Sequence, residues 1–288
     1  MQSPRILLNA AKIRANKELG QNFLTDPSSA EMIVRRSSLS AEDVVLEIGA
    51  GLGALTIPLS RTVKKVYAVE KDRRLAAVLN GELVANDIRN VEIINRDVLK
   101  IDLESLPVSG GTKLIAMGNL PYNISSQILI HLIKNRKVVE RAVIMLQKEL
   151  AHRITSPPGG RDYSRLSVIV QYCAKVKTMA DIKASQFFPR PKVDSRILDI
   201  RFLEPLPFPA VDEKMLFQVL AAAFGKRRKT LKNALSKSQL TFETDMVEKI
   251  LIRAGIDGVR RAETLSVEEF VRLADAFLLA DRYIQSSK

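Results

Sequence analysis

The sequence predicts an α/β protein in which a mostly parallel sheet is followed by a small all-helical region. Three observations lead to this fold class. Strand and helix patterns alternate over about the first 200 residues, a glycine-rich loop (GAGLG) follows the first strong strand, and strand patterns end at EPLPFPAVD, which contains three prolines. Alternation of this kind is typical of a parallel sheet that helices cover on both faces.

The predicted strands are short runs rich in valine, isoleucine and leucine, and helical patterns of apolar residues separate most of them. Parallel strands of this arrangement end at one edge of the sheet, where ligands usually bind. We expect strands at 43–48, 64–70, 91–97, 113–119, 141–147 and 195–203, and helices at 54–60, 73–85, 124–134 and 148–155.

The proline-rich segment 204–212 marks the expected domain boundary. Beyond it only helical stripes of apolar residues occur. We therefore expect a catalytic domain, which carries the glycine loop, over residues 1–204 and a helical domain over residues 205–288. The helical stripes cover 214–224, 226–237, 244–255 and 266–284.

The composition favours a polyanionic partner, nucleic acid before membrane. Lysine and arginine outnumber aspartate and glutamate by 45 to 32, which gives a net charge of +13. A single cysteine excludes a disulfide within the chain, and with only two histidines it argues against a zinc site, so no metal is expected. No apolar run approaches the roughly 20 residues of a membrane span, and we expect a cytoplasmic protein. We also expect a monomer, because nothing in the sequence calls for a larger assembly.

The segment VLEIGAGLGALT (45–56) follows a predicted strand and opens a helix. Gly49 and Gly51 permit a tight turn and close approach of a ligand, and with Ala54 they satisfy the spacing G-x-G-x-x-A. Glu70 ends the next strand, 21 residues after Gly49. An acid at this place accepts hydrogen bonds from ribose hydroxyls. These features indicate a cofactor that contains adenosine, but they do not distinguish a nicotinamide cofactor from others.

Two further acids favour S-adenosylmethionine. Glu47 lies inside the strand before the glycine loop, where a dinucleotide-binding fold usually has an apolar residue. A carboxylate there suits an ammonium and a sulfonium better than a pyrophosphate. Asp97 ends the third strand and can accept a hydrogen bond from an adenine amino group. Three strands that each present a carboxylate therefore predict a Rossmann-like methyltransferase domain.

The tetrapeptide Asn119-Leu120-Pro121-Tyr122 follows the fourth predicted strand and contains no acid, base or metal ligand. Methyl transfer from a sulfonium to a nucleobase amino group needs none, because acceptors that orient the amino group and stabilise the developing charge suffice. Asn119 can accept through its side chain. Leu120 can accept through its backbone carbonyl, which Pro121 keeps out of a helix. Tyr122 can stack on the base.

The chain resembles the small-subunit rRNA adenine-N6,N6-dimethyltransferases nearly from end to end. The motifs that carry the resemblance are, in order, LGQNFLTD, VLEIGAGLGALT, VEKD, NRDVLK, GNLPYNISS, FFPRPKVDS and FGKRRKTLKNAL. The resemblance implies S-adenosylmethionine as methyl donor, with Asn22 and Leu24 beside it. It implies Phe187 as a second wall around the target adenine, opposite Tyr122.

The resemblance also implies a substrate and a role. The expected substrate is 16S rRNA in a small-subunit ribosomal particle, dimethylated at two adjacent adenines in a hairpin loop near its 3′ end. An unstacked loop base can enter a pocket at modest cost. The expected role is in small-subunit ribosome biogenesis.

Residues 226–237 (KRRKTLKNALSK) contain six lysines or arginines and no acid. Leu231 and Leu235 continue the apolar stripe of the preceding helix, so we expect a helix that buries this stripe and exposes its basic face. A solvated run of charge is the alternative interpretation. With the net charge and the resemblance, we expect an RNA-binding domain and name four candidate phosphate contacts: Arg227, Arg228, Lys229 and Lys232.

Three alternatives stay open. A large-subunit rRNA methyltransferase of the macrolide-resistance type shares the glycine loop and a similar tetrapeptide. A noncatalytic nucleic-acid-binding factor could use the same fold, although the intact Asn-Leu-Pro-Tyr argues against it. A nicotinamide oxidoreductase is supported only by the G-x-G-x-x-A spacing.

Overall fold

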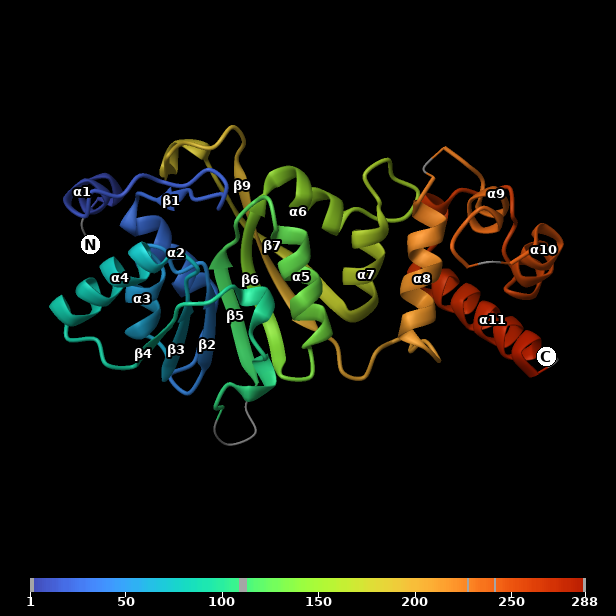
Figure 1. Ribbon diagram of the computed structural model, residues 1–288, viewed down its shortest axis with the longest axis horizontal. Coiled ribbons are helices and arrows are strands. Elements are labelled where there is room, and N and C mark those ends of the chain that lie inside the picture. The colour runs from blue at the N-terminus through green and yellow to red at the C-terminus, as the bar shows by residue number, and fades with distance from the viewer. Residues whose placement is uncertain (1–2, 109–112, 227, 241, 287–288) are drawn as a thin grey trace. The chain divides into compact units, whose positions relative to one another are not determined.

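The computed structural model describes residues 3–108, 113–226, 228–240 and 242–286. Contacts divide the chain into two compact units. Their segments can be followed in Figure 1, which colours the chain by residue number. We call them the sheet unit (Met1–Ala151 and Lys175–Phe202) and the helical unit (His152–Ala174 and Leu203–Lys288). The assignment of a catalytic domain to residues 1–204 and an RNA-binding domain to residues 205–288 stays a prediction.

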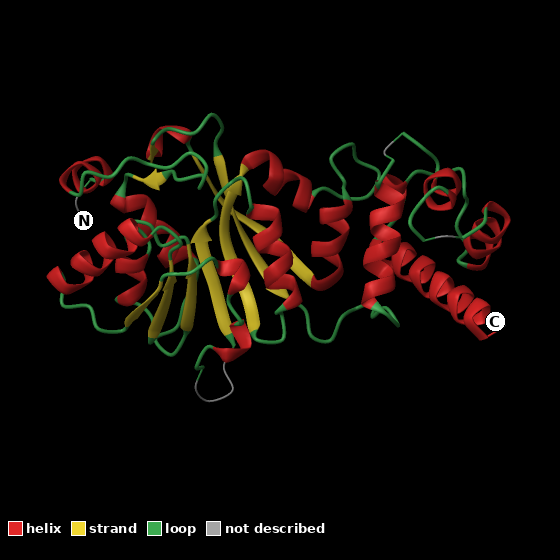
Figure 2. Cartoon of the chain, in the orientation of Figure 1, coloured by secondary structure: helices red, strands yellow, loops and turns green. Residues whose placement is uncertain are grey.

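A seven-stranded sheet forms the centre of the sheet unit, and its strands are yellow in Figure 2. The strand order is β4-β3-β2-β5-β6-β9-β7, with the strands labelled in Figure 1. Strand pairs from β4 to β6 are parallel, and β9 is antiparallel to β6. The predicted α/β fold with a mostly parallel sheet is confirmed. The strands are β2 (Val44–Ile48), β3 (Lys65–Val69), β4 (Val91–Ile94), β5 (Leu114–Asn119), β6 (Val139–Gln147), β7 (Ala174–Ile182) and β9 (Ser195–Phe202), and β1 (Phe23–Leu24) pairs with β8 (Phe187–Phe188).

Helices cover the sheet and connect its strands. All five residues of β2 are buried, which requires cover on both faces of the sheet. Residues of α2, α3 and α4 share one hydrophobic core with β2, β3, β5 and β6. The helices are α1 (Pro4–Ala10), α2 (Pro27–Arg36), α3 (Thr56–Ser60), α4 (Arg73–Ala85), α5 (Ser125–Lys134) and α6 (Lys148–Thr155), with 3-10 turns η1 (Val98–Lys100), η2 (Leu103–Ser105) and η3 (Ala184–Gln186).

The helical unit has its own apolar core. Phe270 and Phe277 of the last helix are fully buried, and the Phe277 ring meets that of Phe242 edge to face at 5.2 Å between centroids. The predicted helical C-terminal region is confirmed. The elements of the helical unit include α7 (Arg165–Cys173), α8 (Glu213–Phe224), α9 (Leu231–Ser236), α10 (Thr244–Arg253), η4 (Ala262–Thr264) and α11 (Val267–Ser286).

The strand order reverses between β2 and β5. The chain adds β3 and β4 on one side of β2 and then returns to add β5 and β6 on the other. Ligands bind in open α/β sheets at such a reversal, beyond the carboxyl ends of the strands. Gly118 lies there, and a Cβ at this residue would be 2.3 Å from the Ile48 carbonyl oxygen. Only glycine therefore lets the end of β5 pass the end of β2 this closely.

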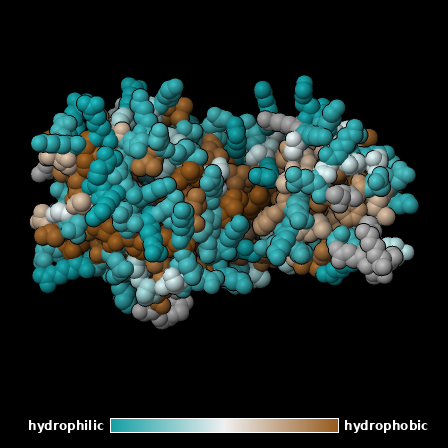
Figure 3. Space-filling model, viewed as in Figure 1, coloured by the Kyte–Doolittle hydropathy of each residue, from teal (hydrophilic) through white to brown (hydrophobic). Residues whose placement is uncertain are grey.

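Hydrophilic side chains predominate on the face of the protein shown in Figure 3, with apolar side chains in groups between them. Within the described part of the chain, no helix is both long enough and apolar enough to cross a membrane. The expected cytoplasmic location stays a prediction.

Candidate active site

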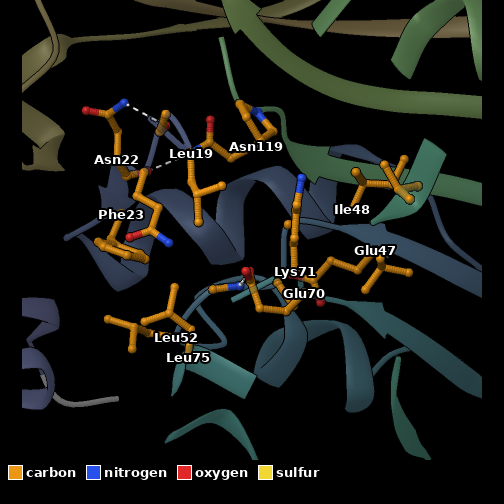
Figure 4. A pocket seen from close by; sticks show the side chains of 18 of the residues that line it. Leu19, Asn22, Phe23, Glu47, Ile48, Leu52, Glu70, Lys71, Leu75 and Asn119 are labelled. Atoms are coloured by element: carbon orange, nitrogen blue, oxygen red, sulfur yellow. Dashed lines mark hydrogen bonds between the residues drawn. The ribbon is translucent and has the colours of Figure 1, made fainter. Parts of the chain in front are cut away.

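A pocket opens in the sheet unit beyond the carboxyl ends of the parallel strands (Figure 4). The ends of β2, β3 and β5, residues just after β4, and the segment around β1 all contribute to it. Residues far apart in the sequence therefore share one cavity. It brings together nine of the predicted site residues: Asn22, Leu24, Glu47, Gly49, Gly51, Glu70, Asp97, Asn119 and Pro121.

The glycine loop turns where β2 ends. Gly49 and Gly51 have φ angles of 76° and 56°, a region that disfavours residues with a Cβ. The Gly49 N–H donates to the Val69 carbonyl oxygen, and the Gly51 N–H donates to a carboxylate oxygen of Glu70, both at 2.9 Å. At Gly51 a Cβ would lie 3.3 Å from the Phe23 ring. The loop is thus tied to the end of β3 and packed closely against β1.

Two carboxylates follow β3 and β4. Glu70 is 7% exposed, and its second oxygen accepts the Asp72 N–H at 2.8 Å; burial raises the pKa of Glu70. Asp97 accepts the Leu99 N–H at 3.1 Å and forms an ion pair with Lys71 at 2.9 Å. The hydrogen-bonded ammonium of Lys71 is the main cause that lowers the pKa of Asp97. The chain itself therefore orients both carboxylates at the places predicted for ribose and adenine contacts.

Glu47 is buried at the base of the pocket. Its side chain is 1% exposed, and among the described residues its Oε2 atom has no hydrogen-bond partner. Burial raises the pKa of Glu47 to about 8, a rise that neighbouring Thr56 reduces and the charge of Glu70 increases. A buried acceptor without a donor costs free energy unless a ligand supplies one. Glu47 therefore fits the cationic group that the sequence analysis assigns to it.

Asn119 ends β5 with its side-chain amide held in one orientation. Its Nδ2 atom donates to the Asn22 carbonyl oxygen at 2.8 Å. Because a carbonyl oxygen accepts only from a donor, this bond also fixes the position of the Asn119 Oδ1 atom. That oxygen is buried, and no donor reaches it from the described residues. Asn119 thus offers a fixed acceptor to a ligand that brings a donor.

The next two residues continue the turn. The Leu120 side chain is buried, and its N–H donates to the Met145 carbonyl oxygen at 3.1 Å. Pro121 lines the pocket, and its carbonyl oxygen accepts the Ile124 N–H at 3.2 Å, just before α5. No hydrogen bond within the described chain engages the Leu120 carbonyl oxygen. Its role as the second acceptor stays a prediction.

The two predicted stacking residues do not line this pocket. The Tyr122 hydroxyl shares a hydrogen bond of 2.7 Å with the Ser195 hydroxyl at the start of β9. Phe187 is 3% exposed, pairs with Leu24 in the β1–β8 ladder and belongs to the core of the sheet unit. A sandwich of the base between Tyr122 and Phe187 stays a prediction, and it requires the Phe187 ring to become accessible.

Sequence reasoning missed several residues of the site. Lys71 lines the pocket, and its position directly after Glu70 at a strand end was an available signal. Gly118, which precedes Asn119 and does not itself line the pocket, was also missed, although a glycine inside a strand pattern often marks a close approach of backbones. Gln21, whose side chain donates to Asp72 at 3.2 Å, and Phe23 also line the pocket. For these two the only signal was the motif LGQNFLTD.

The basic segment of the helical unit is not the single helix predicted over 226–237. α8 ends at Phe224 and α9 begins only at Leu231, with turns and bends in the described residues between them. Gly225 has poor helix propensity, and a continuous helix would place the like charges of Lys226 and Lys229 three residues apart on one face. The expected burial of Leu231 and Leu235 is confirmed.

The four candidate phosphate contacts have different surroundings. Arg228 and Lys229 are exposed. Lys232 forms an ion pair of 2.7 Å with Glu248 in α10, which compensates its charge when no RNA is bound. Arg227 lies outside the described residues. Arg228 and Lys229 are therefore the better-placed candidates.

Other candidate chemistry is sparse. In the described ranges, no group of three or more His, Cys, Asp or Glu residues is arranged to hold a metal ion. The expectation that the protein uses no metal stays a prediction. Cys173 is buried, and its thiol donates to the Ile169 carbonyl oxygen at 3.4 Å.

Sequence comparisons find relatives that match almost the whole chain. Residues 12–277 match the model of the family described as ribosomal RNA adenine dimethylase. Ribosomal RNA small subunit methyltransferase A of Desulforapulum autotrophicum is 54% identical over 276 residues, which cover 96% of each chain. The protein of the same name from Bacillus mycoides is 41% identical over 270 residues, 91% of each chain.

Two solved structures are also similar over most of the chain. A dimethyladenosine transferase from Plasmodium falciparum has a TM-score of 0.76 and 26% identity, covering 91% of this chain and 98% of its own. The 23S rRNA methyltransferase ErmE has a TM-score of 0.64 and 25% identity, covering 88% of this chain and 99% of its own.

Proposed function

The chain belongs to the ribosomal RNA adenine dimethylase family, and from this premise we propose its substrate, cofactor and site residues. It is a methyltransferase that acts on ribosomal RNA. The proposed reaction places two methyl groups from S-adenosylmethionine on the N6 atom of each of two adjacent adenines, in a hairpin loop near the 3′ end of 16S rRNA. The proposed setting is a small-subunit ribosomal particle in the cytoplasm, where the protein acts as a monomer in subunit biogenesis.

The pocket residues fit S-adenosylmethionine by their chemistry. The unpaired buried oxygen of Glu47 suits the ammonium or sulfonium. Glu70 and Asp97, at successive strand ends, suit the ribose hydroxyls and the adenine amino group. Gly49 and Gly51 leave room for close approach, with Asn22 and Leu24 as further neighbours. When bound, the cofactor supplies a methyl group that its positive sulfur has already activated.

The Asn119 amide is the observation that carries the proposal. Its oxygen is fixed, buried and without a donor, and the Leu120 carbonyl oxygen is also unengaged. Two such acceptors can hold the two hydrogens of the target amino group and stabilise the positive charge that develops on its nitrogen. No side chain has to remove a proton before attack, because the amino group reacts while neutral. The proton leaves to water afterwards.

Similarity to named relatives favours the small subunit over the large one. The proteins named small subunit methyltransferase A are 54% and 41% identical to this chain. ErmE, whose name refers to 23S rRNA, is 25% identical. The free acceptor of Asn119 also argues against a noncatalytic factor, for which nothing would maintain an unpaired buried oxygen.

The basic segment supports the RNA part of the proposal. Arg228 and Lys229 are exposed, and the whole chain carries a net charge of +13. Cations that contact phosphates make affinity fall with salt, with a slope of about 0.7 to 0.9 per contact in a plot of log affinity against log salt. Replacing both residues by alanine should therefore lower this slope by about 1 to 2.

The test is incubation with methyl-labelled S-adenosylmethionine and undermethylated ribosomal subunits, small and large separately, followed by mass spectrometry of the rRNA. We expect label on N6 of two adjacent adenines of the small subunit. Label confined to the large subunit would support the macrolide-resistance type instead. Binding of S-adenosylhomocysteine without any methyl transfer would support a noncatalytic factor. Binding of NADH without binding of S-adenosylhomocysteine would support an oxidoreductase.

A further inference from the structure

Lys71 projects into the pocket from a backbone that is held in place. It directly follows Glu70 at the end of β3 and lines the pocket (Figure 4). The Asn95 side-chain amide donates to the carbonyl oxygens of both Glu70, at 2.8 Å, and Lys71, at 3.3 Å. The ends of β3 and β4 are thereby joined, and the origin of the Lys71 side chain is fixed between them.

The Lys71 ammonium occupies one oxygen of Asp97. The Nζ to Oδ2 distance is 2.9 Å, while Asp97 Oδ1 accepts the Leu99 N–H at 3.1 Å. Both carboxylate oxygens are therefore already engaged when the pocket holds no ligand. The Lys71 side chain is 56% exposed and that of Asp97 is 19% exposed. Ion pairs this open to solvent are weak, so a ligand can compete for the carboxylate.

The ion pair places a donor beside an acceptor at one end of the pocket. A 6-aminopurine brings N–H donors, which at Asp97 have to share the carboxylate oxygens with the Lys71 ammonium and the Leu99 N–H. A 6-oxopurine brings an acceptor oxygen, which a lone carboxylate would repel and an ammonium would bind. Lys71 thus hinders the first kind of base and assists the second.

We propose that Lys71 is a specificity-determining residue of the cofactor pocket, which lowers its preference for a 6-aminopurine over a 6-oxopurine. It does so by competing with the amino group for Asp97 and by donating to a 6-oxo group. This inference rests on the proposed function, in which Asp97 receives the base of S-adenosylmethionine. Both effects change the ratio of the two affinities in the same direction, so that ratio is the quantity to measure.

The experiment compares two ligands by calorimetry on the full chain. S-adenosylhomocysteine carries the 6-amino group, and S-inosylhomocysteine carries a 6-oxo group in its place. Lys71→Met keeps an unbranched apolar side chain and removes the ammonium. We expect the ratio of Kd for S-inosylhomocysteine to Kd for S-adenosylhomocysteine to rise about tenfold in this variant, from the lost charged hydrogen bond and the lost competition together. A rise below threefold overturns the inference.

Lys100→Met is the matched control. Lys100 is exposed in η1, does not line the pocket and acts on Asp97 only through its charge. Its replacement should leave the ratio within about twofold of wild type; a shift as large as that of Lys71→Met overturns the inference, because long-range charge would then suffice.

A separate outcome concerns the proposed function. If wild-type protein does not bind S-adenosylhomocysteine, the proposed cofactor is wrong. If Asp97→Ala weakens S-adenosylhomocysteine binding but Lys71→Met leaves the ratio unchanged, the cofactor stands and only the role of Lys71 is wrong.

Discussion

The two halves of the pocket differ in how far they are formed. In the cofactor half, Gly51, Glu70 and Asp97 are held by hydrogen bonds within the chain. In the acceptor half, Asn119 is held, but Phe187, predicted to wall the target adenine, lies outside the pocket in the core. If the proposed function holds, the cofactor site is largely formed without its ligand, whereas the predicted adenine site has to open.

The chemistry of the groups explains this difference. The buried carboxylate of Glu70 accepts the backbone N–H groups of Gly51 and Asp72, which offset the cost of its burial. Glu47 lacks such a donor at Oε2, and burial raises the pKa of its carboxyl group instead. An aromatic ring without a base to stack on is more stable in the core, because burial of its apolar surface is favourable. Phe187 therefore packs with Leu24 across the β1–β8 pair.

The largest expected effect comes from loss of the Asn119 acceptor in the acceptor half. Asn119→Ala removes the fixed acceptor, and we expect the single-turnover rate of methyl transfer to fall by about 10² to 10³, the cost of losing one oriented hydrogen bond to a developing charge. The rate is measured with labelled cofactor on undermethylated small subunits. Among the described residues, the Asn123 amide donates only to the Glu18 carbonyl oxygen, and Asn123→Ala should reduce the rate far less. Equal losses in both variants would refute the role of Asn119.

The next largest effect is on stability and comes from Gly118, where the end of β5 packs against the end of β2. Gly118→Ala places a Cβ against the Ile48 backbone, and the free energy of unfolding should fall by about 3 kcal/mol. The measurement is equilibrium unfolding in urea. Gly81→Ala in α4 is the control: a Cβ there meets no atom within 4 Å, so helix propensity should raise stability by up to about 1 kcal/mol. A harmless Gly118→Ala would show that the close approach of β5 to β2 at Ile48 is not required.

The smallest effect is the pH dependence of ligand binding in the cofactor half. With the pKa of Glu47 raised to about 8, the empty pocket binds an extra proton, which has to leave when Glu47 pairs with the ammonium of the ligand. The Kd of S-adenosylhomocysteine should therefore fall about tenfold from pH 6 to pH 7. Because the unfolded chain loses this proton near the ordinary pKa of glutamate, Glu47 stabilises the ligand-free protein at low pH, and this contribution is lost as the pH rises through 8.

Glu47→Gln removes this ionisation and is the control for both measurements. The Kd of S-adenosylhomocysteine for this variant should change much less between pH 6 and pH 7. The free energy of unfolding of the wild type, relative to that of the variant, should fall as the pH rises toward 8. Identical pH profiles for the two proteins would show that Glu47 is not protonated in the empty pocket.

The same comparison shows what the sequence could predict. Glu47, Glu70 and Asn119 lie at or near the ends of parallel strands and line one pocket, because strand order alone brings strand ends together. The roles assigned to them stay predictions. The orientation of Phe187 could not be predicted, since a motif position does not say whether a ring faces the core or a ligand. The ion pair of Lys71 was missed for a similar reason: it depends on two strand ends in three dimensions.

Some of the fold also escaped prediction. α7 ends at Cys173 and β7 begins at Ala174, with no glycine or proline between them, so VIVQYCAKV showed neither boundary. β7 lies at the edge of the sheet and has only partial burial, which leaves a weak alternation of apolar residues. The break between α8 and α9 was hidden because the apolar stripe continues past Gly225 to Leu231.

The most direct test of the central claim measures binding and rate together in two variants, Glu70→Gln and Asn119→Ala. We predict that Glu70→Gln raises the Kd of S-adenosylhomocysteine about tenfold, with little change in the single-turnover rate at saturating cofactor. We predict the reverse for Asn119→Ala: a Kd within about threefold of wild type and a rate lower by about 10² to 10³. An Asn119→Ala protein that methylates small-subunit rRNA at the wild-type rate would contradict the account.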